Sequence, residues 1–179
     1  FKQIANRLAD ANLVNVDSFM KLCNDAQYTG LYHNEIQNLE GFLYPETYLF
    51  SAQSTEEEII DQMLTQYHLV VDQVIDNSNT HNLSNYEIII LASIIQGEAR
   101  AINEMETISS VFHNRLSKKI PLEANATIQY IIPGKNRRLW EKDLEIDSPY
   151  NTYTNFGFPP TPINNPGIDA IKAALNPEI

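Results

Sequence analysis

A strongly apolar stretch lies near the middle of the chain, between residues 88 and 95. Ser84 and Glu87 precede it, and a serine followed three residues later by a glutamate is the signature of a helix N-terminal capping box. A helix that is apolar almost all round belongs in the interior of a protein. The pattern therefore predicts a buried helix over residues 84–100, too short to span a bilayer, which takes about 20 apolar residues. Its apolar members are Ile88, Ile89, Ile90, Leu91, Ala92, Ile94 and Ile95.

Helical spacing of apolar residues recurs on both sides of this segment. Residues 54–75 carry such a stripe after a second expected capping box, formed by Ser54 and Glu57. A further helix is expected to begin near Asn103, and a last one over residues 167–175. These patterns predict a helical scaffold around the central segment.

Two other segments predict extended structure. Residues 39–50 are rich in aromatics, and Pro45 excludes a central strand position, so two short extended pieces are expected to meet there. Residues 122–132 end in β-branched residues, and Thr127, Gln129 and Ile131 would share one face of a strand. The predicted fold class is therefore α+β: a helical core around the buried helix, with short β strands beside it.

One acid stands out at the end of the predicted central helix. At about 100° per residue, Glu98 falls on the same stripe as Leu91, Ile94 and Ile95. A buried carboxylate is costly, so it either finds a partner or takes up a proton. A carboxyl group that holds a proton is what a general acid requires. The alternative is an ordinary ion pair with a nearby arginine, for which the chain offers Arg100 and Arg115.

Composition narrows the possible functions. The chain has 179 residues, of which 43% are hydrophobic, which is enough for one substantial core. A net charge of −11 argues against nucleic acid or an anionic membrane surface as a partner. The lone Cys23 excludes an internal disulfide framework, and the four scattered histidines show no zinc-ligand spacing, so neither metal nor cofactor is expected. Both chain ends resemble cuts in a longer protein.

Two segments rich in aromatic residues are candidates for ligand binding. Exposed aromatics with carboxylates, as in residues 39–50, suit sugar rings and hydroxyls, although an aromatic core is the alternative interpretation. Residues 148–163 combine aromatics, asparagines and prolines without periodicity, which is typical of a binding loop.

The chain resembles the MltG (YceG-like) endolytic murein transglycosylases in several segments that occur in the same order. The matching segments read Leu-Glu-Gly-Phe-Leu-Tyr-Pro-Glu-Thr-Tyr at 39–48, Leu-Ala-Ser-Ile-Ile-Gln-Gly-Glu-Ala at 91–99, Val-Phe-His-Asn-Arg-Leu at 111–116, Ala-Thr-Ile-Gln-Tyr at 126–130 and Tyr-Asn-Thr-Tyr at 150–153 with the turn at 157–160. Each motif alone is modest, but together they cover nearly the whole chain.

This resemblance identifies Glu98 as the catalytic acid. The catalytic helix of the family commonly reads Glu-Lys-Glu where this chain has Gln96, Gly97 and Glu98, and the second acid of that triplet is the one the family is understood to use. Asn125 stands where relatives often carry an aspartate.

The resemblance implies a lyase reaction on the glycan strands of peptidoglycan. Glu98 would protonate the leaving oxygen of the β-1,4 bond between N-acetylmuramic acid and N-acetylglucosamine. The carboxylate would then take the proton of the muramyl 6-hydroxyl, which closes on C1 to give a 1,6-anhydro end without water. The residues expected to bind the sugars are Glu40, Tyr44, Asn114, Thr127, Gln129, Tyr130, Asn151 and Tyr153.

The resemblance also implies an organisation and a location. Residues 1–36 resemble the end of a LysM-like lobe, and residues 37–179 a YceG-like catalytic domain without its C-terminal elements. The parent protein would be anchored in the cytoplasmic membrane with this domain outside, where cell-wall synthases such as penicillin-binding proteins are candidate partners. Two alternatives stay open here, namely an inactive peptidoglycan-binding module and a glycoside hydrolase that uses water.

Overall fold

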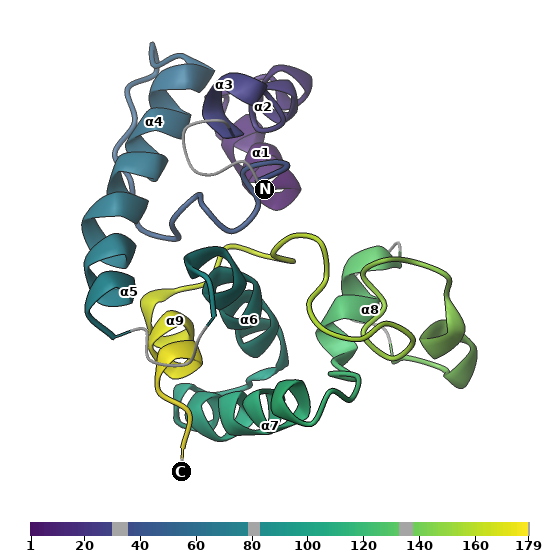
Figure 1. Ribbon diagram of the computed structural model, residues 1–179. Helices are drawn as coiled ribbons and strands as arrows, with labels where there is room; N and C mark the ends of the chain where they lie inside the picture. The colour runs from purple at the N-terminus through teal and green to yellow at the C-terminus, as the bar shows by residue number, and fades with distance from the viewer. Residues whose placement is uncertain (30–35, 79–82, 133–137, 179) are drawn as a thin grey trace.

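The computed structural model describes residues 1–29, 36–78, 83–132 and 138–178, and every regular element in these ranges is a helix (Figure 1). The α-helices are α1 (Lys2–Asp10), α2 (Val16–Leu22), α3 (Ala26–Thr29), α4 (Glu56–Tyr67), α5 (Gln73–Ser78), α6 (Asn85–Glu98), α7 (Met105–Ser117), α8 (Asn125–Ile131) and α9 (Ile168–Leu175). Three shorter elements are the π-helix η1 (His68–Asp72) and the 3-10 helices η2 (Ile102–Glu104) and η3 (Glu141–Glu145).

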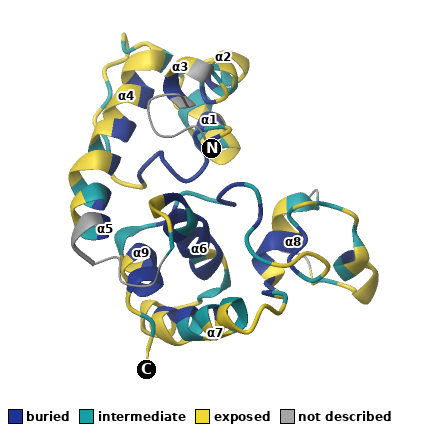
Figure 2. Cartoon of the chain, in the orientation of Figure 1, coloured by how far each residue is buried: buried dark blue, intermediate teal, exposed yellow. Residues whose placement is uncertain are grey.

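The central helix α6 forms as the sequence predicts. The Ser84 hydroxyl accepts from the Glu87 N–H at 3.2 Å, and the Glu87 carboxylate accepts from the Ser84 N–H at 2.7 Å, which confirms the capping box. Every residue from 88 to 95 is buried, and α6 packs against α9, α7 and α8 (Figure 2). This burial confirms the predicted interior helix.

The helical scaffold before α6 is also present, with shifted ends. The capping box of α4 is formed by Thr55 and Glu58, one residue later than predicted. The expected single helix continues as α4, η1 and α5, with Ile59, Ile60 and Met63 among its buried residues. Local pattern fixes which face of a helix is buried more firmly than it fixes the terminal residue.

The predicted α+β fold class is wrong, because no strand occurs in the described part of the chain and the fold is mainly helical. Residues 125–131 form α8 instead of a strand. The Thr127 hydroxyl donates to the carbonyl oxygen of Ala124 at 2.8 Å and is hydrogen-bonded to the Thr152 hydroxyl at 2.9 Å. These contacts favour the helical turn over the strand preference of the β-branched residues.

Residues 39–50 do not pair as strands either. Gly41 has a φ of +96°, and the N–H groups of Gly41 and Leu43 donate to the side-chain oxygen of Asn165 at 2.9 and 3.0 Å. An asparagine side chain thus takes the place of a neighbouring strand. Phe42, Leu43 and Tyr44 are buried, so this part of the segment follows the alternative interpretation as aromatic core.

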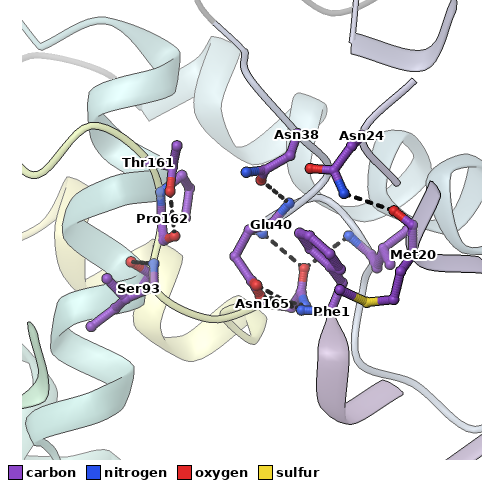
Figure 3. Close-up of polar contacts among 12 residues, drawn as sticks. Phe1, Met20, Asn24, Asn38, Glu40, Ser93, Thr161, Pro162 and Asn165 are labelled. Atoms are coloured by element: carbon purple, nitrogen blue, oxygen red, sulfur yellow. Dashed lines mark hydrogen bonds and ion pairs between the residues drawn. The ribbon is translucent and has the colours of Figure 1, made fainter. Parts of the chain in front are cut away.

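Residues 39–44 and 161–167 lie against each other between the N-terminal helices and α6, and we call this pair of segments the clasp (Figure 3). The Ser93 hydroxyl of α6 accepts from the Ile163 N–H at 3.0 Å, and the Asn164 side chain donates to the Ser93 carbonyl oxygen at 2.8 Å. A Cβ on Gly41 would lie 2.6 Å from Pro162, so the two segments touch with no room for a side chain. The clasp therefore fixes the second half of the chain onto the first.

Buried side chains from α1 through α9 belong to one continuous core. Ala5 of α1 and Phe19 of α2 are members of this core, and α2 also packs against α4. The division into a lobe over residues 1–36 and a domain over 37–179 stays a prediction. Within the described residues, no helix combines the length and the apolar character needed to cross a membrane.

Candidate active site

Glu98 is the last residue of α6, where the buried part of the helix ends. Its side chain is half-buried, and its Oε1 accepts from the backbone N–H of Ala126 at 2.7 Å. The predicted acid has therefore found a partner in a backbone donor at the start of α8. In the described part of the chain the other oxygen, Oε2, has no hydrogen-bond partner.

The arginine alternative does not describe this site. Arg115 donates to the Glu123 carboxylate at 2.7 Å and to the carbonyl oxygen of Pro121 at 2.9 Å. The backbone N–H of Arg100 donates to Glu104 at 3.1 Å. No ion pair joins Glu98 to either arginine among the described residues.

The start of α8 is held by Thr152 in the irregular segment 148–163. Its hydroxyl accepts from the Ala124 N–H at 3.0 Å, and its carbonyl oxygen accepts from the Glu123 N–H at 2.9 Å. Thr152 and its hydroxyl partner Thr127 are both buried, with 2% and 0% exposure. A buried hydroxyl network therefore positions the backbone that meets Glu98.

Tyr153 also contacts the start of α8. Its hydroxyl donates to the side-chain oxygen of Asn125 at 2.8 Å. Burial raises the pKa of the Tyr153 hydroxyl, the negative charges of Glu98 and Glu123 raise it further, and Arg115 lowers it in part. The phenol therefore stays protonated, and its hydroxyl is bonded to the first residue of α8.

Tyr130 belongs to α8, and Asn151 lies in the irregular segment 148–163 next to Thr152. The Asn151 amide donates to the carbonyl oxygens of Leu144 and Ile146 at 2.9 and 2.8 Å, and its side-chain oxygen accepts from the Tyr153 N–H at 2.9 Å. It is fully buried, so the structure places it as the organiser of its own loop. The Tyr130 ring lies 5.0 Å from that of Tyr150, and burial raises the pKa of its hydroxyl.

Glu40 and Tyr44 belong to the clasp. The Glu40 side chain is 7% exposed, its oxygens lie 2.7 Å from the amino nitrogen of Phe1, and it accepts from Asn165 at 3.3 Å (Figure 3). Tyr44 is 6% exposed, and burial raises the pKa of its hydroxyl, with the Glu46 carboxylate adding to that effect. Among the described residues, neither forms a hydrogen bond or an ion pair with Glu98, and their predicted contact with sugars stays a prediction.

The remaining predicted residues differ in exposure. Asn114 on α7 and Gln129 on α8 are exposed, whereas Thr127 is buried in the network described above. Gln96 points elsewhere than Glu98, because its side-chain oxygen accepts from the Gly167 N–H at 3.2 Å, at the N-terminus of α9. Its environment is that of a helix cap.

Several contributors were missed by the sequence analysis, namely Gly97, the Ala126 backbone, Thr152 and Asn165. A backbone donor has no side-chain signal, so Ala126 could not be found from sequence. Gly97 did carry a signal, since an isolated glycine in a helix usually has a packing reason. No group of histidine, cysteine or acidic side chains in the described ranges has the arrangement of a metal site.

Comparison with known proteins places this geometry in context. The chain matches the YceG-like family over residues 1–179. It is 37% identical to the endolytic murein transglycosylase of Bacillus subtilis over 179 residues, which cover 99% of the chain and 49% of that protein. It is 36% identical to the endolytic murein transglycosylase of Streptococcus pneumoniae D39 over 143 residues, 77% of the chain and 26% of that protein.

A solved structure shows the same arrangement. The crystal structure of a yceG-like protein from Listeria monocytogenes superimposes with a TM-score of 0.88 at 32% sequence identity. The match covers 99% of this chain and 64% of that one. The chain thus spans about half or less of the curated relatives it matches.

Proposed function

The chain belongs to the YceG-like family, and on that premise we propose that it is the catalytic part of an endolytic murein transglycosylase. Its substrate is the glycan strand of peptidoglycan, and the bond broken is the β-1,4 link from N-acetylmuramic acid to N-acetylglucosamine. The observation that carries this proposal is the position of Glu98, half-buried at the end of a buried helix with Oε1 held and Oε2 left for a ligand.

Glu98 acts first as an acid. Because Oε1 accepts from the Ala126 N–H in either protonation state, the proton that is transferred resides on Oε2. Oε2 donates this proton to the glycosidic oxygen as the bond from that oxygen to the muramyl C1 breaks. The electron pair of the bond leaves with the oxygen of N-acetylglucosamine, and C1 becomes electron-deficient.

Glu98 then acts as a base. The muramyl 6-hydroxyl attacks C1, its proton passes to Oε2, and the new O6–C1 bond closes the 1,6-anhydro ring. The carboxyl group ends in the state in which it began, so the reaction consumes no water. Most glycosidases need a second carboxylate as nucleophile or base, and this internal attack replaces it.

The accessible predicted residues hold the sugars on either side of the broken bond. Tyr153 is a partly accessible polar side chain bonded to the start of α8, Tyr130 and Gln129 are exposed on α8, and Asn114 is exposed on α7. Thr127 and Asn151 support the same site from within by fixing α8 and its loop.

The resemblance also supports a location and partners for the parent protein. We propose that it is anchored in the cytoplasmic membrane with this domain on the outer side, near penicillin-binding proteins that build the wall. Protease digestion of intact protoplasts should remove this domain, and crosslinking in growing cells should capture a synthase. Protection from protease in intact protoplasts would contradict the location.

Mass analysis of products from purified glycan strands tests the reaction itself. The complete protein is incubated with strands in water enriched in ¹⁸O. We expect new ends that are 1,6-anhydro-muramyl and that contain no ¹⁸O. Labelled reducing ends would show a hydrolase instead, and strand binding without any new ends would show a binding module.

A further inference from the structure

Arg115 lies in the last turn of α7, beside the segment that leads into α8 (Figure 1). Its Nη1 donates to the Glu123 carboxylate at 2.7 Å and to the carbonyl oxygen of Pro121 at 2.9 Å. The side chain is 29% exposed, and its Nε and Nη2 have no hydrogen-bond partner among the described residues and are not buried. The guanidinium is thus fixed at Nη1, and its other edge is accessible.

This accessible edge has the geometry that a carboxylate requires. The N–H groups of Nε and Nη2 lie in one plane and point in parallel, so that together they can donate to the two oxygens of one carboxylate. Glu123 occupies Nη1 only, and it therefore orients the guanidinium without blocking this edge. An ion pair with this much exposure adds little to stability, so orientation is its main effect.

Glu123, which orients Arg115, is itself held in place. Its backbone φ is +52°, which is uncommon for a residue that has a side chain. Its N–H donates to the carbonyl oxygen of Thr152 at 2.9 Å, and the Thr152 hydroxyl accepts from the next N–H, that of Ala124. The same residue therefore fixes both the partner of Arg115 and the start of α8.

These contacts place Arg115 near Glu98. The N–H of Ala126 donates to Glu98, and Ala126 is three residues after Glu123, a separation of at most about 11 Å along the backbone. Both charges also reach the Tyr153 hydroxyl, because Glu98 raises the pKa of this group and Arg115 lowers it. The separation is comparable to the length of one disaccharide unit of a glycan strand.

We propose that the Nε and Nη2 edge of Arg115 binds a carboxylate of the muramyl residue whose bond Glu98 breaks. Muramyl residues carry a lactyl group, whose carboxylate is free when no stem peptide is attached, and a stem peptide brings carboxylates of its own. N-acetylglucosamine carries none, so this contact selects which of the two alternating β-1,4 bonds lies at Glu98. The proposal rests on the proposed function for the identity of the strand.

The overall charge of the chain makes a local contact of this kind necessary for recognition. A net charge of −11 repels a strand that carries carboxylates. A fixed guanidinium beside the acid provides attraction at one position, and such local complementarity contributes to specificity more than to overall affinity.

Glycan strands with and without carboxylates test the proposal on the complete protein. One set of strands keeps its stem peptides, and a second set has them removed, which frees the lactyl carboxylates. In a portion of each set, the carboxylates are converted to methylamides. For at least one set, the wild type should show a kcat/KM about 10–100-fold above that for the neutralised portion, the range of a hydrogen bond to a charged group. A preference in the peptide-free set identifies the lactyl carboxylate, and one confined to the other set identifies the stem peptide.

Two variants assign this preference to Arg115. Arg115→Lys keeps the charge but loses the paired N–H groups, and Arg115→Gln loses both. Each should lower the preference for carboxylate-bearing strands about tenfold or more. A purely structural role would lower cleavage of both kinds of strand equally, and an unchanged preference would overturn the proposal.

Lys118→Gln is the matched control, because it removes an exposed positive charge three residues later. It should keep the wild-type preference, and an equal loss in this variant would overturn the proposal in favour of a general charge effect. If neither Arg115 variant folds, equal wild-type rates on neutralised and unmodified strands of both sets would still overturn it.

Strand binding separates this proposal from the proposed function. Affinity is measured with Glu98→Gln, with and without Arg115→Lys. Glu98→Gln should bind unmodified strands about tenfold or more tightly than neutralised ones, and Arg115→Lys should abolish the difference. Wild-type protein that releases no anhydro ends would contradict the function, while the affinity ratio would still decide the role of Arg115. Anhydro ends together with equal affinity for both kinds of strand would overturn the proposal and leave the function intact.

Discussion

Two glutamates, Glu40 in the clasp and Glu98 at the end of α6, show how motifs of one family reach different environments. Glu40 lies in the clasp at 7% exposure, and its Oε1 accepts from the Asn165 side chain at 3.3 Å. Glu98 is half-buried, with Oε1 engaged and Oε2 without a partner in the described residues. Both stand in motifs that resemble the same family, and among the described residues Glu98 has one oxygen without a hydrogen-bond partner.

The regions around these two acids differ in the same way. In the clasp, Asn165 and the Ser93 hydroxyl satisfy backbone groups of residues 41–43 and 163, and the aromatic side chains face the core. Near the start of α8, the buried hydroxyl groups of Thr127 and Thr152 are hydrogen-bonded to each other, and the Tyr153 side chain remains partly accessible. On the proposed function, we expect the clasp to contribute stability and the Glu98 region to contribute chemistry.

The strongest test of this contrast is Glu98→Gln. The amide can still accept from the Ala126 N–H, so the fold should be intact, but it cannot donate and recover a proton. Cleavage of glycan strands should fall by at least about 10²–10⁴-fold, because one residue provides both acid and base catalysis. The measurement is the rate of release of 1,6-anhydro ends, with circular dichroism to confirm folding.

Two control variants accompany Glu98→Gln. Glu104→Gln makes the same chemical change at an exposed acid just beyond α6, and Gln96→Ala alters a cap of α9. Both should keep most of the activity. Full activity in Glu98→Gln would show that another group is the acid.

Asn165→Ala tests the clasp. The substitution leaves the N–H groups of Gly41 and Leu43 without acceptors, and each such buried group costs about 1–3 kcal/mol of unfolding free energy. Urea denaturation should show this loss, whereas the kcat of the remaining folded protein should change little. Asn103→Ala, at an exposed position without a side-chain hydrogen bond among the described residues, should shift the unfolding free energy by less than about 0.5 kcal/mol. An unchanged denaturation midpoint in Asn165→Ala would remove the structural role assigned to the clasp.

Thr152→Val tests the hydrogen bonds that hold the start of α8. It preserves shape but removes the hydroxyl that accepts from Ala124 N–H, at a cost of about 1–3 kcal/mol. Unlike Asn165→Ala, it should also lower kcat, because the start of α8 holds Glu98. Thr154→Val, in the same loop but exposed, is the matched control. If Thr152→Val loses stability but keeps its kcat, the hydroxyl network of Thr127 and Thr152 has no role in catalysis.

A separate effect, on stability alone, concerns alkaline pH and the buried thiol of Cys23. Burial raises the pKa of Cys23 from 9.0 to about 12; the amino group of Phe1 opposes this and the Glu40 carboxylate adds to it. The unfolded thiol therefore ionises before the native one, so its contribution to stability is complete below pH 9.0 and is lost as pH rises toward about 12. Cys23→Ala should show a shallower loss of unfolding free energy across this range. Identical slopes in both proteins would contradict it.

The sequence predicted the parts of the fold that local pattern determines. The capping box at Ser84 and Glu87 and the apolar run after it specify α6, and the helical stripe points to Glu98. The helix α8 could not be predicted, because its β-branched residues favour a strand and its helical form depends on Thr152, which is distant in the sequence.

The same limit applies to the candidate site. The acid has a side-chain signal, but its partner is the Ala126 backbone N–H, and any residue except proline provides one. The aromatic segment at 39–48 carries the composition of a sugar site, yet Asn165 and the core decide that Phe42 and Tyr44 are buried. Composition does not distinguish these environments until distant segments meet.

The Asn165 contacts also bear on when the protein becomes native during synthesis. They join residues that are 122 and 124 positions apart. At about 5–20 residues per second, a ribosome takes on the order of ten seconds to make the intervening chain. Throughout that time the N–H groups of Gly41 and Leu43 lack their final acceptor, and the aromatic residues beside them lack the segment that covers them. The nascent chain therefore carries an uncovered aromatic surface at least until the segment with Asn165 has been made.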